Sequence, residues 1–367
     1  MSHAINPEML VLARESRGMS QKDLAETISV SQAKISKYEN GLFTVSEDDL
    51  EAIAKVLGYT QEFFFQRDRV YGLGSSFLFH RQRVQVPMHV QRKVQAEINI
   101  LRMQVERLLR GVEIDAECRF EPIDADAFDG DVARIAALVR AAWKLPLGPV
   151  ANVTASIEAA GGIVLKCSFE TNLIDAAHLL LPGLPPLFFV NRDLPGDRLR
   201  WTLAHEAGHA VMHQNPTGDV EDQANCFASE FLMPAEEIAN QLDDLTMRQA
   251  AVLKQQWKVS MAAIVMRAHD LGRISEYKYR KLNIGLSAQG YKMVEPFPIE
   301  VEEPQVVRQM VEMHRTDLGY NDFDLARLLF SPDPQFFGTG QRIEVFKFDN
   351  QPFFAFFPEH TGRRSSG

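Results

Sequence analysis

The first part of the chain shows apolar residues at helical spacing, interrupted by glycine and serine. Ser20 precedes one such pattern and can cap the free backbone amides of a helix, and Asp23 completes a capping-box arrangement. A further helix is predicted to start at Ser31 and to end at Gly41, because glycine readily adopts a left-handed conformation. Two helices joined by a turn of a few residues predict a helix-turn-helix.

A longer amphipathic pattern follows Pro87. From Val94 onward, apolar residues recur at intervals of three and four, which predicts one long helix. Residues 77–110 contain seven basic and two acidic side chains and are therefore locally cationic. One interpretation is a linker helix that packs against a second domain with a solvated basic face. The other is a dimer helix, or a DNA contact additional to that of the helix-turn-helix, in which Arg102 and Arg107 bind phosphates.

Near residue 200 the chain contains the pattern H-E-x-x-H within a segment that is apolar at helical spacing. His205 and His209 are about one helical turn apart, so both imidazoles project from the same face and can bind one metal ion. Glu206 lies beside the first histidine, where its carboxylate can reach a water on the metal without being a ligand. The spacing therefore predicts a catalytic metal site with Glu206 as the base.

A tetrahedral catalytic zinc site needs a third protein ligand. Residues 221–234 predict another helix, and this helix carries two carboxylates, Glu221 and Glu230. Glu221 is preferred as the third ligand, because a short turn through residues 215–218 can bring the early part of the helix back to face the two histidines. Glu230 is the alternative.

Two more polar residues lie close to these positions in the sequence. Asn225 follows Glu221 by one helical turn and can orient a ligand from outside the coordination sphere. His213 lies one turn beyond His209, too far along the helix axis to join the same tetrahedron easily. We interpret His213 as a supporting or core residue. No residue stands out as the donor that would stabilise an oxyanion.

The C-terminal part gives weaker patterns. Residues 306–330 predict two helices, the second opened by Asn321 or Asp322. Residues 342–360 alternate and are rich in aromatic side chains, which predicts a hairpin. The last residues, 361–367, are predicted to be disordered.

Composition limits the class of protein. The chain has 367 residues, of which 46% are hydrophobic and 24% charged, and these values are typical of two or three globular domains. No apolar run is long enough to cross a bilayer and the N-terminus lacks a signal-peptide pattern, so we expect a cytoplasmic protein without membrane contact. The three cysteines lie far apart, which argues against a disulfide framework and a thiolate zinc site.

Charge limits the way in which the protein can bind nucleic acid. The net charge of −10 excludes a general polyanion binder with a wholly cationic surface. Residues 1–70 contain eight basic and eleven acidic side chains. We therefore expect low non-specific affinity for DNA, so that useful binding needs two copies on a repeated or palindromic double-stranded operator. A homodimer is the resulting hypothesis.

The sequence LARESRGMSQKDLAETISVSQAKISKYENGLFTVSEDDLEAIAKVLGY resembles the five-helix DNA-binding domain of Cro and the lambda repressor (the XRE type), over about residues 7–65. The resemblance implies a phosphate contact at the start of the second helix and a third helix that faces the major groove. Glutamine can pair with adenine, lysine can bind guanine or phosphate, and alanine can admit a thymine methyl. The DNA-binding residues assigned in this way are Gln21, Ser31, Gln32, Ala33, Lys34 and Lys37.

The segment R-x-R-W-T-L-A-H-E-x-G-H-x-x-x-H, followed by E-x-Q-A-N-x-F-A-x-x-F-L-M-P, resembles the ImmA/IrrE family of zinc metallopeptidases, over about residues 130–290. Members of this family cleave phage-type or stress-response repressors. The resemblance implies that zinc is the cofactor, with His205, His209 and Glu221 as its ligands and Glu206 as the general base.

Together these observations predict a protein that is mainly α with a small β-sheet (α+β). The expected domains are a helix-turn-helix DNA-binding domain (1–70), a basic amphipathic linker helix region (71–128), an ImmA/IrrE-like metallopeptidase domain (129–290), and C-terminal helices with a hairpin and a disordered tail (291–367).

Three functions are compatible with this organisation. The leading hypothesis is a transcriptional regulator that binds operator DNA and whose zinc metallopeptidase-like domain senses a signal or cleaves a repressor-type protein. The second is an active zinc endopeptidase that uses its helix-turn-helix to dock a substrate. The third is an antitoxin-like repressor that binds a toxin protein and has an inert metal site.

Overall fold

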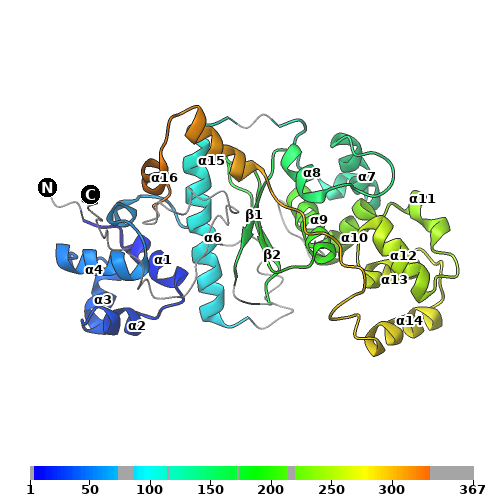
Figure 1. The fold of residues 1–367 in the computed structure, drawn as a ribbon, viewed down its shortest axis with the longest axis horizontal. Coiled ribbons are helices and arrows are strands. Elements are labelled where there is room, and N and C mark those ends of the chain that lie inside the picture. The colour runs from blue at the N-terminus through cyan, green and yellow to red at the C-terminus, as the bar shows by residue number, and fades with distance from the viewer. Residues whose placement is uncertain are drawn as a thin grey trace, which may run out of the picture.

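The computed structural model describes residues 4–72, 86–113, 116–169, 171, 173–213 and 220–330. Figure 1 shows a helical N-terminal lobe, a long helix beside it, a small central sheet and a second helical lobe. This part of the chain is mainly α with a small mixed sheet, which confirms the predicted fold class. The elements are α1 (Pro7–Ser16), α2 (Gln21–Thr27), α3 (Gln32–Glu39), α4 (Glu47–Leu57), η1 (Gln61–Phe65), α6 (Met88–Leu109), η2 (Ala125–Phe128), α7 (Val132–Ala142), α8 (Val153–Ala159), β1 (Ile163–Cys167), β2 (Ala176–Leu179), β3 (Leu187–Asn191), α9 (Gly196–Met212), α10 (Val220–Leu232), α11 (Ala235–Ile238), η3 (Ala239–Gln241), α12 (Met247–Trp257), α13 (Met261–Asp270), α14 (Glu276–Ala288), α15 (Val306–Thr316) and α16 (Asp322–Leu328).

The N-terminal lobe is built by α1 to α4 and η1. The Ser20 hydroxyl accepts a hydrogen bond from the Asp23 amide, and the Asp23 carboxylate accepts one from the Ser20 amide, so the predicted capping box is present at α2. Ser31 caps α3 through its side chain. Ile35 of α3 is fully buried in the core of the lobe. Helix α3 therefore packs by one face and presents the opposite face to solvent.

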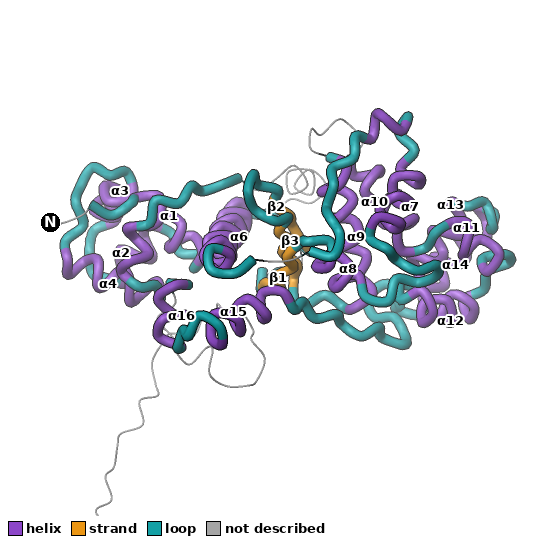
Figure 2. The backbone as a smooth tube through the Cα atoms, turned by 90° about the horizontal axis from the view of Figure 1, so that it is seen from above, coloured by secondary structure: helices purple, strands orange, loops and turns teal. Residues whose placement is uncertain are grey.

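Helix α6 is the predicted long helix, but two of its faces are buried. Ile100 and Met103 belong to the core of the N-terminal lobe, whereas Ile98 and Leu101 belong to the core that covers the sheet. Figure 2 shows α6 between the N-terminal lobe and the strands. The helix thus joins two hydrophobic cores.

The prediction of a solvated basic face on this helix is wrong for its two central arginines. Arg102 is 2% exposed and Arg107 is 5% exposed. Arg107 donates to both carboxylate oxygens of Asp68, at 3.2 and 2.7 Å, and Arg102 donates to the carbonyl of Arg69 at 3.0 Å. A phosphate contact by these arginines is excluded for the same reason. Their charge is used to attach the end of the N-terminal lobe to α6.

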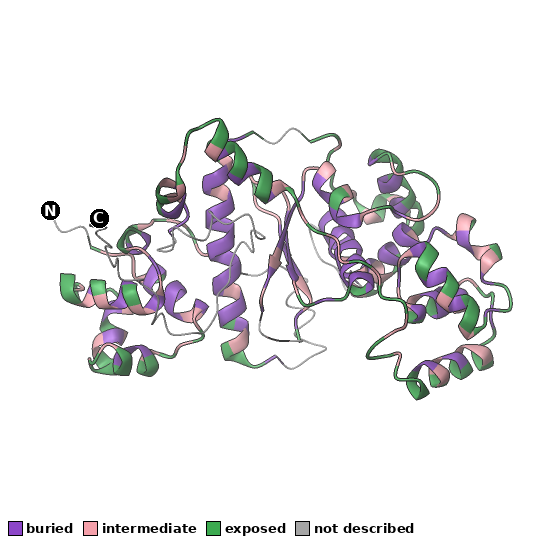
Figure 3. Ribbon diagram, in the orientation of Figure 1, coloured by how far each residue is buried: buried purple, intermediate pink, exposed green. Residues whose placement is uncertain are grey.

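The sheet has the strand order β1-β3-β2, with β1 parallel and β2 antiparallel to β3. Leu187 and Phe189 of β3 pack toward α6 and α15, and Phe188 and Val190 pack toward α8 and α9. Both faces are therefore covered, which explains why β3 is a continuous apolar run. Figure 3 shows the burial of the strands. Strand β2 forms an edge of the sheet beside α9.

After α14 the chain returns through residues 291–305, which are fixed by carboxylates at the starts of helices. Glu295 accepts backbone hydrogen bonds at the start of α13, and Glu302 accepts them at the start of α8. Glu158 accepts two backbone amides at the start of α15. The positive end of a helix favours a carboxylate at each of these places.

Helices α15 and α16 are the two C-terminal helices expected from the sequence, and Asn321 caps the second. Beyond α16, Phe330 enters the core of the N-terminal lobe, with its ring centroid 5.8 Å from that of Phe63. The predicted hairpin (342–360) and tail (361–367) lie outside the described residues. Within the described ranges, no helix is both long and apolar enough to span a membrane.

Candidate metal centre and nucleic-acid interface

The histidines of the H-E-x-x-H pattern lie on α9, and α10 packs directly against this helix. Gly208 faces the ring of Phe227 on α10, and a Cβ at this position would stand 2.9 Å from a ring carbon. That separation is too short for any residue with a side chain. Glycine therefore allows α10 to come close enough for Glu221 to reach both His205 and His209.

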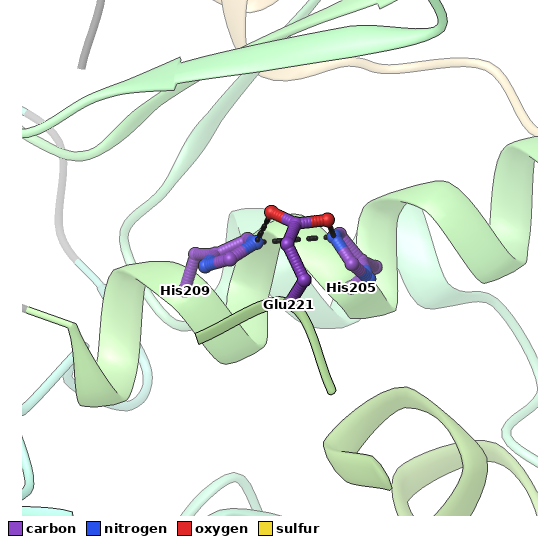
Figure 4. Close-up of side chains that lie close together, drawn as sticks. All are labelled: His205, His209 and Glu221. Carbon is purple, nitrogen blue, oxygen red and sulfur yellow. Dashed lines mark hydrogen bonds and ion pairs between the residues drawn. The ribbon is translucent and has the colours of Figure 1, made fainter. Parts of the chain in front are cut away.

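Three side chains from these two helices converge on one point (Figure 4). The Nε2 atoms of His205 and His209 are 3.0 Å apart, and the carboxylate oxygens of Glu221 lie 3.7 and 3.2 Å from them, respectively. One donor atom of each residue lies within 4.8 Å of the others, so the three could hold one metal ion. The carboxylate of Glu230, the alternative ligand, instead forms an ion pair with Arg267.

Asn225 fixes the orientation and the tautomer of His205. Its side-chain oxygen Oδ1 lies 3.1 Å from Nδ1 of His205. Because an amide oxygen can only accept, we assign the proton of a neutral His205 to Nδ1. The lone pair of Nε2 then points toward His209 and Glu221.

Two side chains, Gln223 and His213, fix the orientation and the tautomer of His209 through a chain of hydrogen bonds. The Oε1 atom of Gln223 accepts from Nε2 of His213 at 2.8 Å, which leaves Nδ1 of a neutral His213 without a proton. This nitrogen lies 2.8 Å from Nδ1 of His209 and accepts a hydrogen bond from the N–H of His209. The Nε2 lone pair of His209 is thus also directed at the cluster. The sequence indicated His213 as a supporting residue but gave no sign of Gln223.

Glu206 has a buried partner that sequence reasoning missed. His178, on edge strand β2, places its Nδ1 atom 2.6 Å from Oε2 of Glu206. Both side chains are less than a tenth exposed. His178 precedes Glu206 by 28 residues, and only the pairing of β2 with β3 brings it over α9. A lone histidine in a short apolar segment carries no local signal of such a contact.

The protonation states of the cluster suit a cation. Burial lowers the pKa of His205 and lowers that of His213 to about 4, which favours neutral imidazoles. Burial raises the pKa of Glu221, whereas His209 and His205, when their imidazoles are protonated, lower it by more. Burial also raises the pKa of Glu206, and the hydrogen bond and charge of His178 lower it to about 2. Both carboxylates are therefore ionised near neutral pH.

The residues assigned to DNA contact lie on α2 and on α3, around its exposed face. Gln32 donates to the side-chain oxygen of Gln21 at 3.3 Å, and Gln21 donates to Glu39 at 2.8 Å, so the two glutamines support each other. Ser31 and Ala33 are exposed at the start of α3. The first turn of α3 thus presents short polar groups and one methyl.

Both lysines of α3 contact groups of their own lobe. The Lys34 ammonium lies 2.6 Å from Oδ2 of Asp49 on α4. The Lys37 ammonium lies 4.4 Å from the ring centroid of Phe43, in the loop after α3. The charge of Lys34 is therefore compensated by a carboxylate of the same lobe, whereas Lys37 contacts a neutral ring and keeps its positive charge.

Comparison with protein-family models gives two matches. Residues 10–63 match the model described as a helix-turn-helix, and residues 158–269 match the model of the IrrE N-terminal-like domain. The second match contains His205, His209 and Glu221. No curated protein matches the chain. The two matches bear out the predicted fusion of an XRE-type helix-turn-helix to an IrrE/ImmA-like domain.

Proposed function

Because the chain fuses a helix-turn-helix DNA-binding domain to an IrrE-like peptidase domain, we propose that it is a transcriptional regulator with a zinc-dependent second domain. Residues 1–70 bind operator DNA, and residues 129–290 hold zinc and either sense a signal or cleave a repressor-type protein. The observation that carries the proposal is the convergence of His205, His209 and Glu221, with Glu206 next to His205 in the chain.

The donor set supports a metal ion on chemical grounds. Two imidazole lone pairs and one carboxylate face each other without a proton assigned between them, and this arrangement is repulsive unless a cation lies among them. Two nitrogens and one oxygen from protein, with a further position left open, are typical of catalytic zinc. Asn225 and His213 supply the outer hydrogen bonds that such ligands usually have.

The chemistry that follows is amide hydrolysis. Zinc, when bound, supplies Lewis-acid activation of water and polarises a peptide carbonyl. Glu206 accepts a proton from the attacking water and later delivers it to the leaving amine. His178 orients the Glu206 carboxylate through the contact at Oε2.

The proposal for DNA rests on the exposed start of α3. We propose that Gln32, which is hydrogen-bonded to Gln21, forms two hydrogen bonds with one adenine, and that Lys34 and Lys37 bind guanine or phosphates. The acidic lobe makes a single copy a weak binder, so we propose a homodimer on a palindromic operator in the cytoplasm. A repressor or a toxin protein is the proposed protein partner.

Glu206→Gln tests the enzymatic part of this proposal. The full-length protein and the variant are purified, their zinc is measured by mass spectrometry, and each is incubated with a peptide library made from a cell digest. Zinc in both proteins with new cleavage products from the unchanged protein alone supports a peptidase. Zinc in both and products from neither supports a sensing domain. Absence of zinc from both contradicts the metal site.

Selection from a random duplex library tests the regulatory part. The unchanged protein is expected to enrich a repeated or palindromic sequence, and the double variant Gln32→Ala, Lys34→Ala is expected to lose the enrichment. Enrichment that survives in the double variant would place the DNA-binding surface elsewhere in the chain.

A further inference from the structure

An ion pair between Lys34 of α3 and Asp49 of α4 affects how the N-terminal lobe discriminates operator DNA from other DNA. Lys34 lies in the first turn of α3, the part of a recognition helix that contacts base edges. Its ammonium is already bound to Asp49, at 2.6 Å. Any DNA phosphate that approaches Lys34 must therefore compete with a carboxylate of the same lobe.

Asp49 is held in a position that makes it a strong competitor. It lies in the first turn of α4, where the helix dipole favours negative charge. The hydroxyl of buried Tyr38 donates to the same Oδ2 atom at 2.5 Å. The Asp49 side chain is 14% exposed, whereas that of Lys34 is 38% exposed. The carboxylate is thus held by two contacts, and the lysine is the more exposed partner.

The charge of Asp49 persists at neutral pH. Burial raises the pKa of Asp49, but hydrogen bonds from Lys34 and Tyr38 lower it below its usual value. Protonation therefore does not release Lys34 under ordinary conditions. Release requires another acceptor for the ammonium.

We propose that Asp49 is a specificity-determining residue that occupies Lys34 and thereby suppresses sequence-independent binding to DNA. This inference rests on the proposed DNA-binding function. On random DNA, a single phosphate replaces one ion pair by another of similar strength, so Lys34 contributes little. On the operator, Lys34 leaves Asp49 and binds a base edge, and Gln32 forms its own contacts with bases at the same time. Non-specific affinity falls more than specific affinity, and the ratio between them rises.

The neighbouring residue Asp48 provides a matched control. It belongs to the same first turn of α4 but is exposed, and within the described ranges it forms no ion pair with a lysine or arginine. Asp48→Asn and Asp49→Asn change the net charge by the same amount. Any difference between them reports the contact with Lys34 and not the charge of the lobe.

The test is fluorescence anisotropy of the full-length protein with a labelled random-sequence duplex of 20 base pairs, in sodium chloride from 50 to 200 mM. Asp49→Asn is expected to bind about 3- to 5-fold more tightly than the unchanged protein, by the upper part of the scale of a surface ion pair. Its plot of log affinity against log salt should be steeper by about 0.9, the value for one added phosphate contact. Asp48→Asn should change affinity less than about 2-fold, because its charge only screens at a distance.

A second background shows whether the effect acts through Lys34. In Lys34→Ala, the further change Asp49→Asn should give the same small effect as Asp48→Asn. Asp49→Ser, which can also accept from Tyr38, repeats the measurement if thermal unfolding shows that Asp49→Asn is unstable.

The outcomes separate this inference from the function on which it rests. If the unchanged protein binds and Asp49→Asn behaves like Asp48→Asn, or if the gain persists without Lys34, the inference alone is wrong. If no variant binds any duplex at 50 mM salt, the DNA-binding function is wrong and the inference falls with it.

Discussion

At the metal cluster His209 is 1% exposed and its ring is fixed by the neutral imidazole of His213, whereas on α3 the Lys34 ammonium lies near the surface and is held by the charged Asp49. Neutral acceptors leave the lone pairs of the cluster directed at one point, so the metal ion that we propose would find its site preformed. At the DNA-binding face that we propose on α3, Lys34 must give up its charged partner before it can bind DNA. Substitutions at the cluster should therefore have large effects, and substitutions on α3 small ones.

The largest effect is expected on stability, at the ion pair between Arg107 of α6 and Asp68, which attaches the N-terminal lobe to α6. Arg107→Met leaves Asp68, whose side chain is 10% exposed, without its partner, and breaking a buried ion pair costs about 3–5 kcal/mol of unfolding free energy. Urea denaturation measures this cost. The salt dependence of DNA binding should stay unchanged, because Arg107 is too buried to reach a phosphate.

Arg110→Met is the control for this prediction. Arg110 is the C-cap residue of α6, but its side chain is 65% exposed, so its removal should cost less than about 1 kcal/mol. If the two variants were equally stable and DNA binding by Arg107→Met depended less on salt, α6 would have to be a DNA contact after all.

Replacement of the predicted third ligand should have the next largest effect. Zinc-site binding free energies of about 10–16 kcal/mol are shared among three or four ligands, so Glu221→Gln should lower zinc affinity on the order of 10²- to 10³-fold. Competition with a chromophoric chelator measures the affinity. Glu230→Gln makes the same chemical change on the same helix and should retain zinc, because Glu230 contacts Arg267. The reverse result would make Glu230 the ligand.

The sequence alone predicted those features that depend on residues close together in the chain. The capping box at Ser20, the single face shared by His205 and His209, and the approach of Glu221 all follow from helical periodicity and a short connection. Each depends on residues close together in the chain. Local geometry therefore predicted the arrangement of the helices and of the three candidate ligands.

Contacts between distant segments could not be predicted in this way. His178 reaches Glu206 only because an edge strand crosses α9, and Arg107 finds Asp68 across 39 residues. A basic side chain in an amphipathic helix has the same pattern whether it is solvated or buried against a carboxylate. Only the packing of α6 between two cores decides between these states.

A residue that supports a ligand should have a smaller effect than the ligand itself. Asn225→Ala removes the acceptor for Nδ1 of His205, and loss of such outer hydrogen bonds costs about 10- to 100-fold in metal affinity. The same chelator competition measures it. Cys226→Ser, at the next position and exposed, is the control and should leave zinc affinity unchanged. An Asn225→Ala variant with unaltered affinity would show that the cluster is not preformed by its neutral partners.

The smallest effect is expected at the other lysine of α3. In the free protein the Lys37 ammonium is already stabilised by its contact with the Phe43 ring. Lys37→Gln therefore loses only the difference in free energy between a phosphate contact and this ring contact. We expect affinity for random duplex to fall by no more than about 5-fold and the salt slope to decrease by about 0.9 at most. Lys55→Gln, the same change on α4, should leave the slope unchanged. A loss on the order of 100-fold for Lys37→Gln would mean that the recognition face depends on a single charge as strongly as the metal cluster depends on a ligand, and the contrast between the two regions would disappear.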